Sequence, residues 1–336
     1  DDVQLLYAER DVRELVDILR TQGQVASDRV RLLIHEDAAT ARRTLLALNA
    51  TLRSEVEDQR RRTALVVFYS GHADAEALHL RGSRLAFDEL RALVASSPAA
   101  IRLLIVDACR SGAVTRVKGV RAAPEFQIGI NDRLEAEGMA ILSSSAAGES
   151  SQESDRLRAS FFSHHLVNAL RGAADRDGDG RVTLAEAYAY TYAETLRSSG
   201  STLTLQHPTY AYDVKGSGDL VLTTAEGSRG SGQLRLGPAG TYLITEEREA
   251  GPVVAELRAR RDRAVLMLPR GRYFVQQRGT EEFREYRVQL EPGAIVDLQQ
   301  VPSRLLRYDL LVRKGGTPCT GKEVTLALAL RLVRQD

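Results

Sequence analysis

Two short apolar runs, Ala64 to Tyr69 and Ile101 to Val106, constrain the fold of this chain more than any other feature. Neither run alternates with polar residues, so each is predicted to be a strand buried on both faces. Such strands occur in parallel sheets that helices cover on both sides. Apolar residues recur at helical spacing over 12–19 and 41–52, and Val30 to Ile34 indicates a further strand. The pattern predicts an α/β/α sandwich with a mainly parallel sheet.

The pattern changes toward the C-terminus. Residues 227–232 are rich in Gly and Ser, and short alternating runs separated by turn residues follow them. We therefore expect a first domain over 1–224, a linker over 225–233 and a small β-sandwich-like accessory domain over 234–336. The final alternating run, 323–333, is expected to add one more strand to that accessory domain.

Charge and cysteine content exclude several classes of function. The 46 Lys and Arg residues nearly cancel the 45 Asp and Glu residues, which leaves a net charge of +1 and no basic surface for nucleic acid. The two cysteines, Cys109 and Cys319, fall in different predicted domains, so no disulfide framework is expected. No run of about 18 apolar residues is present, and no membrane span is expected. The compartment stays open between cytoplasmic and exported.

Both buried strands lead into residues suited to nucleophilic catalysis. The first is followed by Gly71 and His72, and the second by Asp107 and Cys109. Ligands of open α/β sheets bind at the carboxyl ends of the strands, so His72 and Cys109 are predicted to be neighbours. A thiolate is a strong nucleophile, and an imidazole can deprotonate the thiol or protonate a leaving amine. The backbone N–H groups of Gly71 and Cys109 are predicted to bind the oxyanion.

The motifs Ser-Gly-His at 70–72 and Asp-Ala-Cys-Arg-Ser-Gly at 107–112 resemble the catalytic signature of the caspase-like cysteine peptidases. The likeness is greater to the metacaspase and bacterial, peptidase C14-like members than to the animal caspases. It covers roughly residues 1–224 and includes Ser-Ser-Ser at 143–145. It implies the caspase-like fold, a Cys–His dyad and endopeptidase activity. The structural alternative is a buried Cys and a core His with its hydrogen bonds satisfied.

The resemblance also implies a substrate preference. Animal caspases carry Gln where this chain has Asp107. In the metacaspase branch the matching Asp and an Asp of the first helix, here Asp11, line the primary specificity pocket. The implied substrate-binding residues are Asp11, Asp107, Ser143 and Ser145, and the implied cleavage follows Arg or Lys of a protein or peptide, because a desolvated cation needs opposite charge. Alternatively, Asp107 caps a turn and Asp11 pairs with a nearby Arg.

Two features bear on activation. The loop over 113–132 carries Arg116, Lys118 and Arg121, and loops at this place are cleaved in relatives by the enzyme itself or by an activating protease. An ordinary surface loop is the alternative. The family has a strand before its first helix, and this sequence opens without one, so we expect either that the chain was trimmed or that an earlier piece was cut away.

The segment from Asp175 to Glu186 matches the twelve-residue EF-hand loop, with carboxylates at positions 1, 3, 5 and 12 and Gly at position 6. This spacing places oxygen atoms around one hard cation and predicts a Ca²⁺ site. The predicted ligands are Asp175, Asp177, Asp179, the Arg181 carbonyl, Thr183 and Glu186. The alternative is an acidic helix–turn–helix that keeps the loop shape without metal.

His164 and His165 follow each other on a predicted amphipathic helix over 161–170. Neighbouring residues of a helix point in different directions, so at most one of the two is expected to face the core. A metal-binding role is not expected for them.

The sequence leaves three functional hypotheses. The first is a cysteine endopeptidase that cleaves after Arg or Lys through Cys109 and His72 and is activated by loop cleavage, by calcium or by both. The second is a catalytically inactive, calcium-binding caspase-like scaffold or adaptor. The third is an effector zymogen activated by another protease. The intact pair of His72 and Cys109 favours an enzyme.

Overall fold

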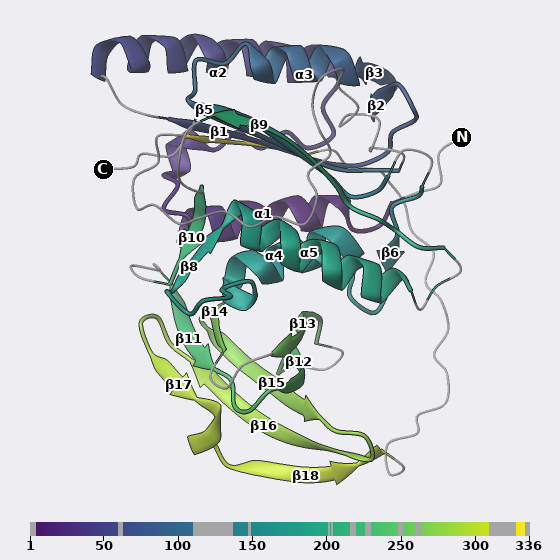
Figure 1. Cartoon of the computed structure of the whole chain (residues 1–336), viewed down its shortest axis with the longest axis vertical. Helices are drawn as coiled ribbons and strands as arrows, with labels where there is room; N and C mark the ends of the chain where they lie inside the picture. Colours follow the sequence, from purple (N-terminus) through teal and green to yellow (C-terminus); the bar gives the residue numbers. More distant parts are fainter. Residues whose placement is uncertain are drawn as a thin grey trace.

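The protein is stacked in layers in the computed structural model (Figure 1). Helices α2 and α3 cover one face of a central sheet, α1, α4 and α5 cover the other, and a β domain lies below them. The structure describes residues 5–59, 63–109, 137–146, 149–200, 202, 204–215, 220–225, 230–247, 251–259, 264–308 and 327–332. The helices are α1 (Ala8–Thr21), α2 (Ala38–Gln59), α3 (Phe87–Ala95), α4 (Phe161–Asn168) and α5 (Leu184–Ser199), with a π-helical turn at Ala169–Ala173 and 3₁₀ turns at Ser27–Arg29 and Leu298–Gln300.

The central sheet has three parallel strands flanked by two antiparallel ones, in the order β19-β1-β4-β5-β9. Its strands are β1 (Ala64–Ser70), β4 (Ile101–Asp107), β5 (Glu137–Ser143), β9 (Thr209–Lys215) and β19 (Ala327–Leu332). Three short pairs surround it, formed by β2 (Ala77–Leu80) with β3 (Ser83–Ala86), β6 (Glu153–Ser154) with β7 (Ala159–Ser160), and β8 (Arg181–Thr183) with β10 (Val221–Thr224).

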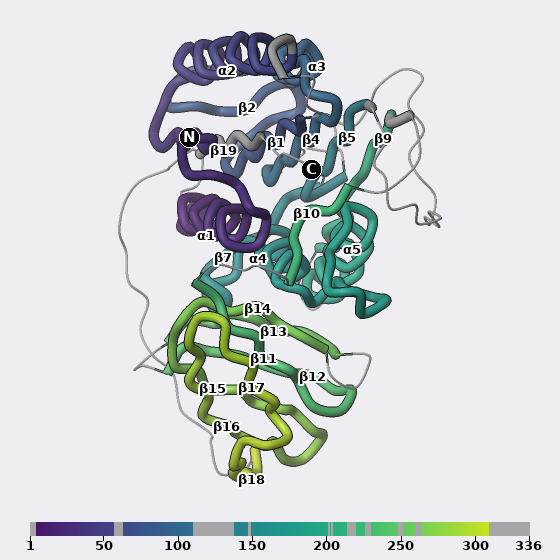
Figure 2. The backbone as a smooth tube through the Cα atoms, turned by 90° about the vertical axis from the view of Figure 1, so that its left-hand side faces the viewer, coloured from purple at the N-terminus to yellow at the C-terminus, as the bar shows by residue number. Residues whose placement is uncertain are grey.

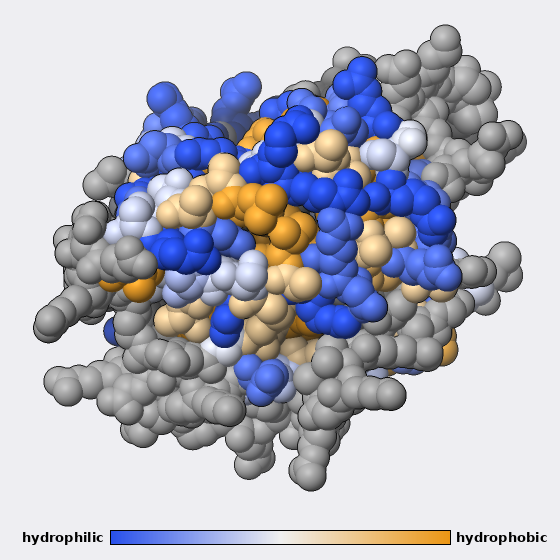
Figure 3. Space-filling view, turned by 90° about the horizontal axis from the view of Figure 1, so that it is seen from above, coloured by the Kyte–Doolittle hydropathy of each residue, from blue (hydrophilic) through white to orange (hydrophobic). Residues whose placement is uncertain are grey.

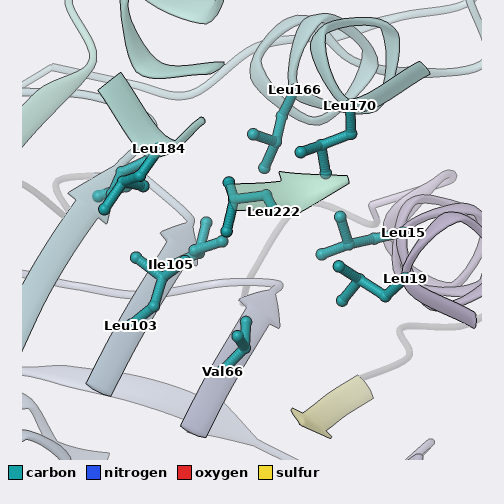
Figure 4. Close-up of a pocket in the computed structure, with 10 residues that line it drawn as sticks. Leu15, Leu19, Val66, Leu103, Ile105, Leu166, Leu170, Leu184 and Leu222 are labelled. Atoms are coloured by element: carbon teal, nitrogen blue, oxygen red, sulfur yellow. The ribbon is translucent and has the colours of Figure 1, made fainter. Parts of the chain in front are cut away.

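Side chains of the central strands alternate between two apolar cores, because successive residues of a strand point to opposite faces. Val66 and Phe68 face the core that is shared with α1 and α4. Leu65 and Val67 face the core that is shared with α2 and α3. Figure 4 shows leucines of α1 and α4 and apolar side chains of β1 and β4 pointing into one space in the first of these cores. The unbroken apolar runs of the sequence thus serve burial on both faces.

The β domain consists of two sheets around one core. A three-stranded sheet has the order β14-β11-β17, and a five-stranded sheet has the order β13-β12-β15-β16-β18. Leu234 and Leu266 of the first sheet and Tyr242 and Val275 of the second belong to one buried cluster. The strands are β11 (Ser231–Arg235), β12 (Gly240–Glu246), β13 (Val253–Ala259), β14 (Val265–Pro269), β15 (Gly271–Arg278), β16 (Glu282–Leu290), β17 (Ile295–Asp297) and β18 (Ser303–Arg307).

The predicted boundary between the domains differs from the structure at two places. Strand β11 begins at Ser231, inside the predicted linker. A side chain at Gly232 would lie 2.7 Å from the Glu291 carbonyl oxygen, so this glycine serves close packing rather than flexibility. Residues 327–332, assigned from the sequence to the accessory domain, instead pair with β1 of the central sheet. A strand pattern does not specify its partner, and the outer edge of β1 offers unpaired backbone groups.

The predicted strand at Val30 to Ile34 is absent, and this prediction was wrong. Val30 and Ile34 pack against the core beside α1, so their apolar character serves packing rather than strand pairing.

The outer surfaces reflect this layering. Figure 3 looks onto the face over α2 and α3, where hydrophilic side chains surround a small group of hydrophobic ones. Leu46 of α2 is among the large apolar side chains left exposed. In the part of the chain that the structure describes, no helix is both long and apolar enough to cross a bilayer.

Candidate active site

The two predicted catalytic residues follow neighbouring strand ends. Strands β1 and β4 are parallel and in register, with Ser70 opposite Asp107. His72 lies two residues beyond the first of these ends and Cys109 two residues beyond the second, and both side chains are half-buried. Because parallel strands end at the same edge of a sheet, the pairing brings the imidazole-bearing and the thiol-bearing segments to one place.

Gly71 is required by packing and is not available to an oxyanion. Its N–H donates to the Asp107 carbonyl oxygen at 3.0 Å and so continues the β1–β4 ladder. The prediction that this N–H binds the oxyanion is therefore corrected, because the donor is already used. A Cβ atom at Gly71 would lie 2.6 Å from the hydroxyl oxygen of Tyr69, which explains why glycine stands here.

The main chain around His72 is fixed by the fully buried Tyr69. The Tyr69 hydroxyl lies 2.5 Å from the His72 carbonyl oxygen, to which the His79 N–H also donates at 2.9 Å. Ala73 then pairs with Leu78 in an antiparallel bridge. The bonds that flank this bridge run from His79 to His72 and from Asp74 to Ala77, so Ala73 forms a non-hydrogen-bonded pair and its N–H points away from Leu78.

Serines hold the turn that carries Cys109. The Ala108 N–H donates to the Ser144 hydroxyl at 3.1 Å, and the Ser145 hydroxyl donates to the Ala108 carbonyl oxygen at 3.3 Å. The Ser143 hydroxyl donates to the Ser145 carbonyl oxygen at 3.0 Å. Ser143 and Ser145, expected to bind substrate, are fully buried and brace the protein's own backbone. The Cys109 thiol lies 3.7 Å from the carbonyl oxygen of Ser151.

The two predicted substrate-binding carboxylates, Asp11 and Asp107, are brought together by contacts with the same serine. Asp107 accepts bonds from the hydroxyls of Ser151 at 2.8 Å and Ser163 at 2.5 Å, and from that of Ser160. Asp11 accepts the Ser160 N–H at 3.1 Å. Asp11 and Asp107 are each only 3% exposed, and Ser160 contacts both.

The alternative of an Arg partner for Asp11 does not hold for the described part of the chain. The neighbouring Arg10 bonds to Glu14 at 2.7 Å, and no Arg, Lys or His in that part forms an ion pair with Asp11 or Asp107. Burial raises the pKa of the Asp11 carboxyl well above its usual value, and the charge of Asp107 raises it further.

Two residues of this cluster were missed by the sequence analysis. Ser160 caps the N-terminus of α4 by accepting the Ser163 N–H at 2.9 Å, and a serine before an apolar helix is a signal that could have revealed it. Glu153 accepts the N–H groups of Leu6 at 3.0 Å and Tyr7 at 3.2 Å, at the start of α1. Burial raises the pKa of Glu153 as well. No sequence signal points to Glu153, because its role depends on a contact between distant segments.

The predicted calcium loop brings together three of its four predicted carboxylate ligands. Carboxylate oxygens of Asp175, Asp177 and Glu186 lie within 4.8 Å of one another. Asp179 accepts the Arg181 N–H at 2.7 Å, so its carboxylate closes a turn of the loop.

Glu186 also has a structural role. Thr183 and Glu186 form a reciprocal cap at the start of α5. Burial raises the pKa of both Asp175 and Glu186, and the neighbouring carboxylates of the loop add to this. A bound cation would offset this repulsion.

Several predicted residues lie outside the described residues. These are Arg116, Lys118 and Arg121 of the activation loop, and Cys319.

The chain was compared with known proteins. No family model and no curated protein matches it. Among solved structures, one described as "structure of pro-sf-caspase-1" matches at 14% sequence identity with a TM-score of 0.39, over 65% of this chain and 82% of that chain. A likeness this distant supports no functional argument, so the activity of the chain has to be inferred from the geometry of its own site.

Proposed function

We propose that this protein is a cysteine endopeptidase in which Cys109 is the nucleophile and His72 is its acid–base partner. The observation that carries the proposal is the in-register pairing of β1 with β4, which directs Gly71-His72 and Ala108-Cys109 to one edge of the sheet. The surrounding bonds from Tyr69 and from Ser144 and Ser145 hold both segments in place. Such preorganisation is what a nucleophile and its base require.

The reaction is acyl transfer in two steps. The Cys109 sulfur attacks the scissile carbonyl carbon, His72 accepts the thiol proton, and the C–N bond breaks as His72 donates that proton to the leaving amine. Water then hydrolyses the thioester and restores the thiol. Since the Gly71 N–H is used in the sheet, the N–H groups of Cys109 and Ala73 are the donors proposed for the oxyanion.

The proposed specificity is for Arg or Lys before the scissile bond. Asp11 and Asp107 are buried beside each other without a cationic partner among the described residues. Burying one carboxylate beside another is unfavourable, and a substrate guanidinium or ammonium would relieve that cost through charge-assisted hydrogen bonds. An acidic substrate side chain would add to the repulsion.

Fluorogenic peptides with Arg, Lys or Asp before the reporter test this function. We expect turnover of the Arg and Lys peptides and none of the Asp peptide. Cys109→Ala and His72→Ala should abolish turnover, whereas Cys319→Ala, which removes the other thiol, should leave it unchanged. Turnover that persists in Cys109→Ala would contradict the assignment of the nucleophile. Preference for the Asp peptide would contradict the acidic specificity.

A second proposal concerns calcium. We propose that Asp175, Asp177 and Glu186 bind Ca²⁺, supported by the convergence of their oxygens and by the EF-hand spacing. A ligand that binds only the folded state stabilises it by about 2.7 kcal/mol at one hundred times its Kd. Ca²⁺ should therefore raise the melting temperature of Cys109→Ala, a background that prevents self-cleavage.

Glu186→Gln is the matched control for the calcium proposal. Gln at this position keeps the helix cap but removes a charged ligand, so calcium should no longer raise the melting temperature. An equal calcium shift in both proteins would contradict the site. Calcium binding together with no turnover of any peptide would favour the scaffold hypothesis.

A further inference from the structure

The β6–β7 hairpin, residues 153–160, connects the acidic cluster to the β domain. At its open end Glu153 lies opposite Ser160. Ser160 contacts both Asp11 and Asp107, and Glu153 accepts the N–H groups at the start of the helix that carries Asp11. The hairpin therefore forms one side of the proposed recognition site for the basic side chain.

The tip of the same hairpin lies against the β domain (Figure 2). Arg156 forms an ion pair with Glu256 of β13 at 2.6 Å. Leu157 is 1% exposed and belongs to one apolar cluster with Phe161 of α4 and Val253 of β13. These contacts join a loop of the first domain to a strand of the second.

A second set of contacts links the hairpin to β13 through α1. Arg10 donates to the carbonyl oxygens of Leu157 at 3.5 Å and Arg158 at 3.2 Å. Arg10 also bonds to Glu14, whose other oxygen lies 3.6 Å from the guanidinium of the buried Arg171. Arg171 in turn donates to the Val254 carbonyl oxygen at 2.7 Å. Two independent routes thus connect the hairpin with the β domain.

The strand pairing within the hairpin is short. It consists of two residue pairs, and an isolated two-stranded hairpin is marginally stable at best. Its position is therefore decided by what its two ends contact. The acidic cluster supplies one set of contacts. At the tip, β13 supplies the other set together with Arg10 of α1 and with Tyr7, whose hydroxyl donates to Asp155 at 2.8 Å.

We propose that the β domain positions the recognition site of the peptidase domain, with Arg156 and Leu157 as positioning residues for the substrate's basic side chain. This inference rests on the function proposed above. A change at the hairpin tip should therefore weaken binding of the substrate's basic side chain. The positions of Cys109 and His72 should not change, because β1 and β4 hold the segments that carry them.

Charge reversal at the hairpin tip tests the inference. Arg156→Glu and Glu256→Arg each create a like-charged pair, and the double variant restores an attractive one. This ion pair is only partly exposed, and a surface ion pair contributes up to about 1 kcal/mol, which corresponds to a factor of about five. We expect each single variant to raise KM for an Arg peptide about fivefold with kcat unchanged, and the double variant to restore KM.

Two further measurements make the test specific. The alkylation rate of Cys109 should stay constant in all variants, because the thiol does not depend on the hairpin tip. Amide hydrogen exchange over 153–160 should accelerate in the single variants and recover in the double variant. Arg270→Glu is the matched control, since Arg270 pairs with Glu291 at 2.9 Å within the β domain, away from the hairpin.

The outcomes separate this inference from the proposed function. Single variants that leave both KM and hydrogen exchange unchanged, or a double variant that restores neither, would overturn the positioning role. A wild-type protein that cleaves no peptide would refute the proposed function alone. Hydrogen exchange would then still decide whether the β domain holds the hairpin.

Discussion

At the scale of the residue, the fold changes the pKa of the Asp11 carboxyl in a way that its position near the start of a helix does not suggest. An Asp in the first turn of a helix is common, because it favours the helix dipole. Here the carboxyl is also buried beside Asp107, and both effects raise its pKa above the usual 3.8. The ionised carboxylate binds a guanidinium far better than the neutral acid does.

We therefore expect KM for an Arg peptide to depend on pH through Asp11. As pH rises through the raised pKa, Asp11 becomes ionised in the free enzyme, and KM should fall. Asp11→Asn should remove this dependence and raise KM about tenfold or more, since a hydrogen bond to a charged group contributes about 1.5–3 kcal/mol. Steady-state kinetics of both proteins at a series of pH values above the usual pKa of 3.8 would measure this change in KM. An unchanged KM in Asp11→Asn would exclude Asp11 from recognition.

At the scale of the element, α4 shows how packing overrides a simple amphipathic pattern. The sequence predicted that at most one of His164 and His165 faces the core. This prediction was wrong, because both side chains are buried, with exposed fractions of 5% and 1%. The helix is covered on several sides, by α1, α5 and β13. The His165 imidazole contacts the Ser198 hydroxyl of α5 at 2.8 Å, which links the two helices.

Acid should destabilise this helix pair. Burial, with a smaller effect from Arg197, lowers the pKa of His165 to about 3, whereas an unfolded His titrates near pH 6.5. Between these values the unfolded state binds a proton that the folded state does not, so stability falls as pH falls from about 6.5 toward 3. A difference of one bound proton between the two states changes the free energy of unfolding by about 1.4 kcal/mol per pH unit.

Urea unfolding of Cys109→Ala at pH 7.5 and pH 5 would measure the loss, and the same measurement on Cys109→Ala/His165→Gln isolates His165. We expect the second protein to lose about 2 kcal/mol less over this range. Equal losses in the two proteins would show that His165 does not carry the effect.

At the scale of the whole molecule, the two domains pack through close backbone contacts as well as through the hairpin. Gly172 has a φ of +110°. A Cβ atom there would lie 2.7 Å from the Val265 carbonyl oxygen of β14. The buried side chain of Gln22 also reaches the Met267 carbonyl oxygen at 3.3 Å.

Gly172→Ala should therefore destabilise the protein by about 3 kcal/mol or more, since it combines an unfavourable φ with a steric clash. Gly293→Ala is the matched control, because Gly293 has a φ of +75° and nothing within 4 Å of an added Cβ. Gly293→Ala should lower the free energy of unfolding by only about 1–2 kcal/mol. Denaturant unfolding gives both values. Equal costs would show that the Gly172 contact does not hold the domains together.

The sequence by itself determined the central strands of this protein and the residues that are proposed to carry its chemistry. Uninterrupted apolar runs require burial on both faces, which predicted β1 and β4, and the residues that follow these strands made His72 and Cys109 the candidate catalytic pair. The acidic spacing of the 175–186 loop likewise indicated that Asp175, Asp177 and Glu186 converge, but it also included Asp179, which is not among them. Each of these inferences depends on residues close together along the chain, where periodicity and spacing act directly.

Only the tertiary structure decided which distant segments meet. It paired 327–332 with β1, used the Gly71 N–H within the sheet, and placed Ser160 between Asp11 and Asp107. It also brought Glu153 to the start of α1 and β13 to the hairpin tip. Such contacts depend on how whole layers pack, because the free energy of burial has no direction and only the assembled fold selects the partner.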